Sequence, residues 1–408
     1  MSPAVASTQG NPMQAATELF EPGEYLNTND TGYFAICGKP AGRWQQQHHE
    51  VSQLHTVIDG LNPHLDTWIS QATFERPNRR AVNLHHIGLL FADLDTYHIP
   101  DLARRKPDEQ AKLLVSYCLH NNIPAPSVVL FSGRGLQPKW ILSEPLARER
   151  AIEWTRVEAA LVTALSDFGA DQNAKDLARV LRVDRTVNTK SGEYCRVVYV
   201  HSGVDNVATR YDFDEIAELF NVSGEQERPR TAPSRSRQSN ILQLPEGFNL
   251  RRLNWYRLED LRTLWRLRGG VPEGHRESTL FWQLNFLMKA APGKVSEFWN
   301  EAQALAAEID TEHFYYKSDL STLYQRAKEQ NVYTPRNQTL ITRFEITPDE
   351  DRQLRTIISY SEKQRRRTEK RRAEGVRPQS ESVERMQPWQ ELGISRRTYY
   401  WRKKHGRL

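Results

Sequence analysis

The chain has 408 residues, of which 38% are hydrophobic and 26% are charged, and its formal net charge is +5. This length exceeds one ordinary hydrophobic core, and the composition indicates a soluble chain of several parts. No apolar run is long enough for a transmembrane helix, and residues 1–16 lack the basic start and apolar middle of a signal peptide, so we expect a cytoplasmic protein without membrane contact.

The three cysteines, Cys37, Cys118 and Cys195, stand far apart in the sequence. None belongs to a CxxC pair or has a histidine at the spacing of a zinc ligand. We therefore expect neither a structural zinc site nor a framework of disulfide bonds.

Composition divides the chain into consecutive segments. Residues 1–20 are expected to be disordered, whereas residues 21–220 alternate short apolar runs with helical patterns, which predicts an α/β or α+β domain. Residues 221–240 are rich in Ser, Arg, Pro and Gln and form a linker with too little apolar surface to fold. Residues 241–333 have apolar side chains at helical spacing, and residues 334–408 form a basic tail.

The first chemical feature is an apolar strand pattern, residues 89–95, that ends in two acidic residues two positions apart, Asp93 and Asp95. Alternate side chains of a strand point to the same face, so both carboxylates can converge on one hard cation. A phosphoryl-transfer site can begin in this way. An isolated pair of this kind more often marks the end of a strand at solvent. Whether the two acids form a functional site therefore depends on the segments downstream.

The second feature follows a helical pattern over residues 107–121. Two short apolar runs between residues 127 and 142 surround a turn of glycine and arginine, which predicts a β-hairpin. Small residues let backbone N–H groups approach an anion, and cations bind phosphate oxygens. The small residues here are Ser132, Gly133 and Gly135, and the cations are Arg134 and Lys139. Taken alone, the segment also fits a plain hairpin.

The third feature is a polar segment, residues 168–192, which follows a second helical pattern over residues 147–165. It holds Asp171 and Asp176, several cations and a turn rich in asparagine. The segment is too polar for a core element. By itself it is more typical of a charged surface loop than of a functional site.

Taken in order, the three segments resemble the archaeo-eukaryotic-type primase and primase-polymerase superfamily, over about residues 65–205. That family carries an hhhDhD strand, then an S-G-x-G hairpin followed by His, then a D…R-h-x-G-T-x-N-x-K segment. The matching residues are Asp93, Asp95, Ser132, Gly133, Gly135, Asp171, Arg182, Thr186, Asn188 and Lys190.

Two positions depart from that pattern. Gln137 stands where many members have a histidine that contacts the nucleotide, and Asp184 with Arg185 replaces a Pro-Gly pair. Glutamine can donate and accept hydrogen bonds, but it cannot carry a proton as imidazole does. Primases of small broad-host-range plasmids are similar in having Gln in this hairpin, so the chain most resembles a primase of a mobile element.

The resemblance implies an α+β catalytic domain over residues 21–220, built on an RRM-like antiparallel sheet, followed by an all-α domain. It implies that Asp93, Asp95 and Asp171 hold two Mg²⁺ or Mn²⁺ ions, with Asp176 as a reserve ligand. One ion would lower the pKa of the attacking 3′-hydroxyl and the other would bind the triphosphate. The residues expected to contact the nucleotide are Ser132, Arg134, Gln137, Lys139, Arg182 and Lys190.

The segment 241–333 has leucine and aromatic residues at helical spacing, including Trp265, Trp282 and Phe286, which we expect in a hydrophobic core. A turn between two of its helices resembles a V-P-x-G-x-R-N-like turn of the small helical domain found after many primases. Its His275 and Arg276 could touch a template or nucleotide, although a turn of this kind more often caps a helix.

The positive charge is concentrated in the tail. Residues 361–408 contain 15 Lys and Arg against 6 Glu, a net charge of +9, which leaves −4 for residues 1–360. Such blocks commonly bind nucleic acid, because binding releases the counterions of the phosphates. We expect a basic helix over residues 351–374.

The end of the tail has a helix-turn-helix pattern, similar to the tails of replication proteins and recombinases. Leu392 to Ser395 indicates a short helix, a glycine turn and a serine that caps a second helix. The start of that second helix would meet base edges and its end would meet phosphates. The residues concerned are Arg396, Arg397, Thr398, Arg402, Lys403 and Lys404. A solvated basic helix is the plainer interpretation.

We therefore predict a DNA primase or primase-polymerase of a plasmid or integrated mobile element. Its expected partners are a single-stranded DNA template, nucleoside triphosphates, origin duplex DNA through the tail, and a replicative helicase. One alternative is a non-catalytic replication initiator, which an intact cluster of mutually repelling carboxylates disfavours. Another is a nickase with Tyr97 as nucleophile beside His85 and His86, which the acids on the strand disfavour.

Overall fold

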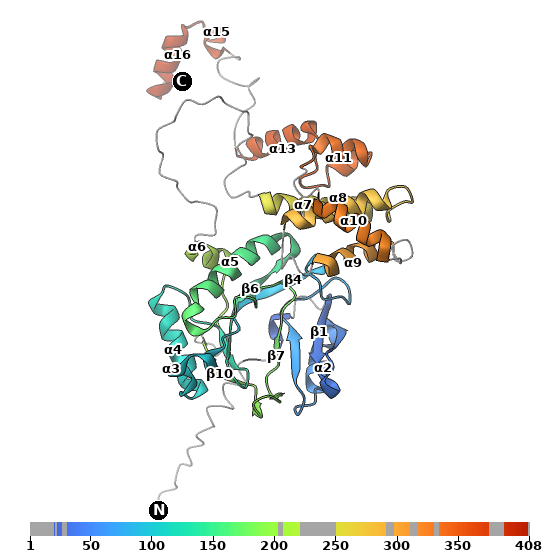
Figure 1. Cartoon of the computed structure of the whole chain (residues 1–408). Coiled ribbons are helices and arrows are strands. Elements are labelled where there is room, and N and C mark those ends of the chain that lie inside the picture. The colour runs from blue at the N-terminus through green and yellow to red at the C-terminus, as the bar shows by residue number, and fades with distance from the viewer. Residues whose placement is uncertain are drawn as a thin grey trace, which may run out of the picture. The chain divides into compact units, whose positions relative to one another are not determined.

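The computed structural model describes residues 20, 23–26, 31–202, 207–220, 250–290, 298–310, 317–329, 334–374 and 387–406 (Figure 1). The chain forms two compact units, Met1–Tyr333 and Thr334–Leu408. The expected disordered N-terminus and the linker over residues 221–240 fall outside the described residues, apart from Phe20. Within the described ranges, no helix is both long and apolar enough to span a membrane.

Two four-stranded sheets and one short ribbon form the first half of unit 1, and every pairing between their strands is antiparallel. The first sheet has the order β2-β1-β3-β7, with β1 Tyr33–Gly38, β2 Gln45–Glu50, β3 Thr67–Ser70 and β7 Val180–Arg182. The second has the order β10-β5-β6-β4, with β4 His86–Phe91, β5 Val128–Phe131, β6 Leu136–Ala147 and β10 Arg196–Val200. The ribbon pairs β8 Val187–Asn188 with β9 Glu193–Tyr194.

Helices complete this α+β architecture, and the predicted class is confirmed. The two helical patterns of the sequence form α4, Pro107–His120, and α5, Ala151–Ala164. Helix α5 packs on β4, where Trp154 donates its indole N–H to the carbonyl of Leu89 at 2.9 Å. The other helices of this half are α2 Leu54–Asp59, α3 Pro100–Ala103 and α6 Phe213–Leu219. The short 3₁₀ helices are η1 Glu24–Leu26, η2 Pro40–Gly42, η3 Val51–Gln53, η4 Ala81–Asn83, η5 Thr96–His98, η6 Arg148–Arg150 and η7 Ser166–Phe168.

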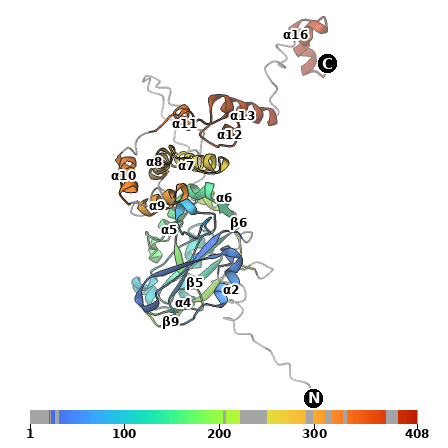
Figure 2. The same ribbon diagram turned by 90° about the vertical axis from the view of Figure 1, so that its right-hand side faces the viewer.

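The second half of unit 1 is helical. It contains α7 Leu250–Leu267, α8 Arg276–Ala290, α9 Phe298–Ile309 and α10 Lys317–Glu329, which lie beside α5 and η4 (Figures 1 and 2). Trp265, Trp282 and Phe286 are buried, so the prediction that these aromatic side chains form a core is confirmed. Burial of such large side chains against one another stabilises the helical layer.

A buried ion network joins this helical layer to the sheets. The guanidinium of Arg262 on α7 is fully buried and lies 2.9 Å from the carboxylate of Glu308 and 3.0 Å from that of Glu259. The same guanidinium donates to the carbonyl of Val82 at 2.6 Å and lies 3.5 Å from Glu75. Burial alone would lower the pKa of Arg262, but the surrounding carboxylates raise it, so the group stays charged.

Two further contacts extend the same interface. Arg148 of η6 forms ion pairs with Glu75 at 2.7 Å and with Glu259 at 2.6 Å. The carboxylate of Glu301 on α9 accepts the backbone N–H groups of Ala81 and Val82 at 3.0 and 2.8 Å. Because these charges are largely buried and each is paired with an opposite charge, this interface has a defined geometry.

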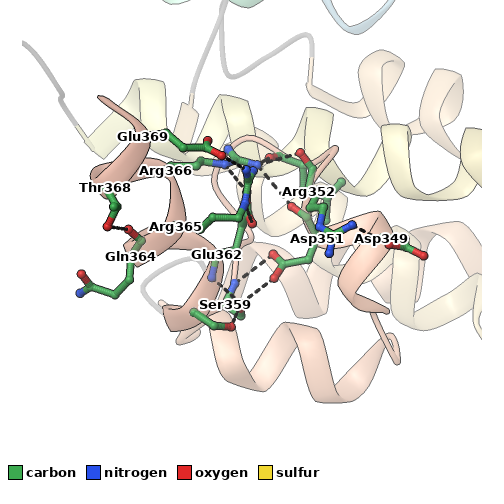
Figure 3. Close-up of polar contacts among 12 residues, drawn as sticks. Asp349, Asp351, Arg352, Ser359, Glu362, Gln364, Arg365, Arg366, Thr368 and Glu369 are labelled. Carbon is green, nitrogen blue, oxygen red and sulfur yellow. Dashed lines mark hydrogen bonds and ion pairs between the residues drawn. The ribbon is translucent and has the colours of Figure 1, made fainter. Parts of the chain in front are cut away.

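Unit 2 begins with α11 Asn337–Arg343, α12 Pro348–Asp351 and α13 Tyr360–Ala373, and ends with α15 Pro388–Glu391 and α16 Arg396–Lys404. The prediction of one continuous helix over residues 351–374 is wrong, because α13 starts only at Tyr360. The carboxylate of Asp351 accepts the N–H and hydroxyl of Ser359, and the Ser359 hydroxyl caps α13 at Glu362 (Figure 3). These side-chain bonds favour a turn over a helix between the two residues.

The basic helix α13 also uses its charge within unit 2. Arg366 donates to Glu362 at 2.6 Å and to the carbonyl of Leu354 at 2.8 Å, and Arg365 donates to Glu362 at 2.7 Å (Figure 3). Arg366, one of the cations that the sequence assigned to a nucleic-acid face, therefore holds the turn between α12 and α13, whereas Arg365 pairs within α13. The exposed cations of α13 include Lys363, Arg367, Arg371 and Arg372.

Removal of the Arg262 guanidinium should strongly destabilise unit 1. We expect Arg262→Met to lower the free energy of unfolding by about 3–5 kcal/mol, because Glu259 and Glu308 would remain buried without their partner. Urea unfolding followed by tryptophan fluorescence measures the change. Arg266→Met is the matched control, since Arg266 is about half exposed and its 3.7 Å pair with Glu75 should contribute at most about 1 kcal/mol. Equal losses in the two variants would contradict the expectation.

Candidate active site

The site is built on a backbone segment that continues β4 along β6. The N–H of Ala92 donates to the carbonyl of Pro138 at 3.1 Å, and the N–H of Leu94 donates to that of Leu136 at 2.8 Å. The side chain of Leu94 is fully buried. This burial fixes which way the alternating side chains point, so the acids on either side of Leu94 share the opposite face.

A second segment pairs with the other edge of the same backbone and adds the third acid. Leu94 and Ala170 form an antiparallel bridge, and the N–H of Asp171 donates to the carbonyl of Asp93 at 2.8 Å. This register sets Asp171 directly opposite Asp93, and Asp95 is two positions further along. The structure thus brings together the three aspartates that the sequence predicted, although Asp95 and Asp171 are 76 positions apart in the sequence.

The surroundings of Asp93 disfavour the charged form of its carboxyl group. Burial, followed by the charges of Asp95 and Asp171, raises the pKa of Asp93 to about 6. A hydrogen bond from the Gln137 amide, at 3.3 Å, and the charge of Arg179 act in the opposite direction without cancelling the rise. Ionisation of Asp93 is therefore costly in this position, and a bound cation would offset that cost.

The donor set fits a hard divalent cation, because carboxylate oxygens are the ligands that Mg²⁺ and Mn²⁺ prefer. Within the described ranges, no group of three or more His, Cys, Asp or Glu side chains is arranged so that it could hold a metal ion by itself. Part of the coordination would therefore have to come from water or substrate oxygens, as is usual for Mg²⁺ at phosphate sites.

The turn between β5 and β6 lies directly against the acidic strand. The hydroxyl of Ser132 accepts the N–H of Gly135 at 3.2 Å, and the amide of Asn188 donates to the carbonyl of Ser132 at 2.9 Å. A Cβ on Gly135 would lie 2.1 Å from the carbonyl oxygen of Leu94, and Gly133 has φ +87°. Only glycine fits at both positions, so the hairpin and the acid strand depend on each other.

Tyr97, which follows the second aspartate on η5, belongs to this cluster and was not among the predicted site residues. The exposed guanidinium of Arg134 lies 4.0 Å from the centroid of the Tyr97 ring. Burial and then an interaction with Asp95 raise the pKa of the Tyr97 hydroxyl. The sequence signal for it is an aromatic residue two positions after the second acid, although by sequence Tyr97 stands out only as a candidate nucleophile.

Lys139 lies in the protein interior rather than on an open phosphate-binding surface. Its ammonium is 3.4 Å from the hydroxyl of Tyr25 and 4.6 Å from the centroid of that ring. Burial lowers the pKa of Lys139 to about 7, against the opposing charge of Asp184. Gln137, two positions earlier, remains directed at Asp93, and its amide oxygen is buried without a hydrogen-bond partner in the described part of the chain.

The two remaining cations of the predicted site differ in their surroundings. Arg182 on β7 forms an ion pair with Asp66 at 2.6 Å, and its guanidinium lies 4.5 Å from the ring centroid of Trp68. Lys190 is exposed and follows Asn188, the residue that supports the Ser132 turn. Asp176, the reserve ligand, is paired with Arg179 at 2.6 Å.

In the tail, the predicted elements form locally. Helices α15 and α16 are joined through Gly393, with φ +61°, and the hydroxyl of Ser395 accepts the N–H of Thr398 at 3.1 Å. The ring of Trp389 lies 6.0 Å from that of Tyr399 and links the two helices. The exposed cations on α16 are Arg396, Arg397, Arg402, Lys403 and Lys404.

The stability of the protein should depend on the charge of Asp93 in a defined pH range. The carboxyl has an ordinary pKa of 3.8 and a raised pKa of about 6 in the fold. Its ionisation therefore opposes folding fully above pH 6 and has no effect well below pH 3.8. We expect Asp93→Asn to raise the free energy of unfolding by about 1–3 kcal/mol at pH 8 in the presence of a chelator.

The gain should shrink as the pH falls from 8 towards 4, which urea titrations at successive pH values would follow. Asp176→Asn is the control, because its carboxylate has the partner Arg179 and the substitution should not stabilise the fold. An Asp93→Asn variant no more stable than the unmodified protein at pH 8 would disprove the electrostatic account.

In comparisons with known proteins, no family model matches the chain. The chain is 26% identical over 326 residues to a replication protein of Clostridium perfringens, a match that covers 79% of this chain and 74% of that protein. The resemblance to replication proteins that its motifs indicated is confirmed by this relative.

Solved structures with a partial likeness were also found. The AEP domain of the primase-polymerase of cyanophage S-2L has a TM-score of 0.35 and 13% identity, covering 48% of this chain and 94% of that one. The catalytic domain of primase RepB′ in complex with initiator DNA has a TM-score of 0.31 and 14% identity, covering 51% and 91%. Primase RepB′ itself has a TM-score of 0.30 and 14% identity, covering 83% and 100%.

Proposed function

We propose that this homologue of a replication protein is a DNA primase of a plasmid or mobile element, which joins nucleoside triphosphates on a single-stranded DNA template. The observation that carries the proposal is the convergence of Asp93, Asp95 and Asp171 on one face by backbone pairing between distant segments. Three carboxylates held together at an electrostatic cost need a function that uses their charge.

In the proposed reaction the 3′-oxygen of one nucleotide forms a bond to the α-phosphorus of the next, and the bond to the leaving pyrophosphate breaks. Mg²⁺ or Mn²⁺ held by the three aspartates would make the 3′-hydroxyl more acidic and offset the charge of the pyrophosphate. Gln137 orients the carboxylate of Asp93 through its amide N–H. Gln137 is buried, as Lys139 is, so we assign it to the support of Asp93 rather than to direct nucleotide contact.

The cations near the cluster divide into two kinds in this proposal. Arg134 is exposed beside Tyr97 and can bind phosphate oxygens of the incoming nucleotide, as can Lys190. Lys139 is buried against Tyr25, so we assign it to the support of the hairpin beneath the site rather than to direct phosphate contact. The exposed cations of α16 are proposed to bind duplex DNA, with the helix set by the Ser395 cap.

Template-dependent synthesis tests the proposal. Purified protein is incubated with unprimed single-stranded circular DNA, labelled ribo- or deoxynucleoside triphosphates, and Mg²⁺ or Mn²⁺. We expect short labelled products from the unmodified protein and none from Asp93→Asn/Asp95→Asn, because that double variant loses two of the three carboxylates. Asp176→Asn is the matched control and should keep most of the activity.

A binding measurement complements the activity assay. We expect Mg²⁺ to raise the Tm of the unmodified protein and to leave that of Asp93→Asn/Asp95→Asn unchanged, since a ligand stabilises the state that binds it. Absence of products with every nucleotide and metal, together with tight binding of duplex DNA by the tail, would replace the primase with a non-catalytic replication initiator.

A further inference from the structure

One face of the first sheet carries a row of residues that the proposed reaction does not use. Residues directly opposite each other in neighbouring antiparallel strands lie on the same face. The register places Gln46, Cys37, Trp68 and Arg182 in one such row across β2, β1, β3 and β7. Trp44 lies on the connection from β1 to β2, next to this row, and its ring packs against that of Trp68.

The two indoles form an aromatic pair in which Trp44 is exposed and Trp68 is half-buried. Their ring centroids are 5.2 Å apart with an interplanar angle of 48°, and the Trp44 side chain is 46% exposed. An indole this exposed contributes little to a hydrophobic core, so its burial does not explain the arrangement. We call Trp44 and Trp68, together with Lys39 and Arg43, the tryptophan platform.

Positive charge surrounds the rings. The ammonium of Lys39 lies 5.9 Å from the centroid of Trp44 and 5.6 Å from that of Trp68, and the guanidinium of Arg182 lies 4.5 Å from that of Trp68. Arg43 is exposed next to Trp44 in the sequence. Arg182 is neutralised by its ion pair with Asp66, so it orients the Trp68 ring, whereas Lys39 and Arg43 supply the charge at the surface.

This combination matches the chemistry of single-stranded nucleic acid. Aromatic rings stack on unpaired bases, and neighbouring cations bind the phosphates between them, whereas in a duplex the base faces are hidden. The alternative of a second protein chain is less suited, because the polar side chains Gln46 and His48 occupy the β2 end of the same face.

A short segment of the chain connects the tryptophan platform to the acidic cluster. The segment from residue 171 to residue 182 begins at Asp171, which pairs with Asp93, and ends at Arg182, which lies over Trp68. Arg79 ties the same segment to the sheet, since it donates to the carbonyl of Ala178 and, at 2.9 Å, to Gln46. A strand held on the platform would therefore be held by the same rigid framework as the carboxylates.

We propose that Trp44 and Trp68 stack on bases of single-stranded DNA while Lys39 and Arg43 bind its phosphates. That this strand is the template rests on the proposed primase function. The platform would fix unpaired bases without reading their sequence, because every base presents a face that can stack.

Binding of a fluorescently labelled single-stranded oligonucleotide to the full-length protein tests the platform by fluorescence anisotropy. An excess of unlabelled duplex occupies the tail, and nucleotides are omitted so that no synthesis is needed. We expect Trp44→Ala to weaken binding by about 5-fold to about 150-fold, and Trp44→Phe to recover part of the loss. Leu119→Ala is the control, because Leu119 is a 61% exposed apolar residue on α4.

Crosslinking locates the contact independently of affinity. An oligonucleotide with 5-iododeoxyuridine, irradiated in complex with the protein, should attach to Trp44 or Trp68, as mapped by mass spectrometry of the peptides. Equal affinities of Trp44→Ala and Leu119→Ala, or crosslinks confined to other segments, would overturn the proposal.

The two proposals can fail separately. Weakened binding by Trp44→Ala in a protein that makes no primers would support the platform and reject the primase. Primer synthesis combined with unchanged binding by Trp44→Ala would reject the platform and leave the primase in place.

Discussion

The backbone of residues 92–95 is paired on both edges, and the geometry of the candidate site depends on this pairing. Leu94 bonds to Leu136 on one edge, and Asp171 bonds to the carbonyl of Asp93 on the other. Both neighbouring segments approach closely because they have glycine at the contact. Gly135 faces the carbonyl of Leu94, and Gly169, with φ +73°, faces that of Asp95. The strand, the hairpin turn and the third aspartate are therefore set by one local packing constraint.

The same pairing has an electrostatic consequence. It forces three carboxylates onto one face, and burial together with mutual repulsion raises the pKa of Asp93. A fold selected for stability alone would separate or neutralise these charges, whereas functional sites commonly retain such costs. The buried hydrophobic core of unit 1 offsets this cost elsewhere in the structure.

The buried ion network around Arg262 connects two kinds of architecture. Carboxylates on α7 and α9 meet Arg262, Arg148 and the backbone of η4 in a buried interface. Charged groups of this kind have strict directional requirements, so they favour one arrangement of helices on sheets over others. The tryptophan platform and the acidic cluster lie on the sheet framework that this interface braces.

The features that depend on local periodicity and turn chemistry could be predicted from the sequence alone. The alternation around Leu94 placed Asp93 and Asp95 on one face, the apolar runs around the glycine turn predicted the β5–β6 hairpin, and two helical patterns became α4 and α5. The serine before Arg396 predicted the cap of α16. These outcomes depend on neighbours within a few residues, which the sequence displays directly.

The contacts of each cation, in contrast, depend on the tertiary structure. Lys139 is buried against Tyr25, and Arg182 is paired with Asp66 and stacked on Trp68, although both were predicted to contact nucleotide. The helix expected from residue 351 starts at Tyr360, because Asp351 binds Ser359. Burial and ion pairing depend on which distant segments meet, and a linear pattern does not contain that information. For the same reason, the contacts of Tyr97 and of the Trp44–Trp68 pair could not be predicted, because these residues acquire their neighbours only when the chain has folded.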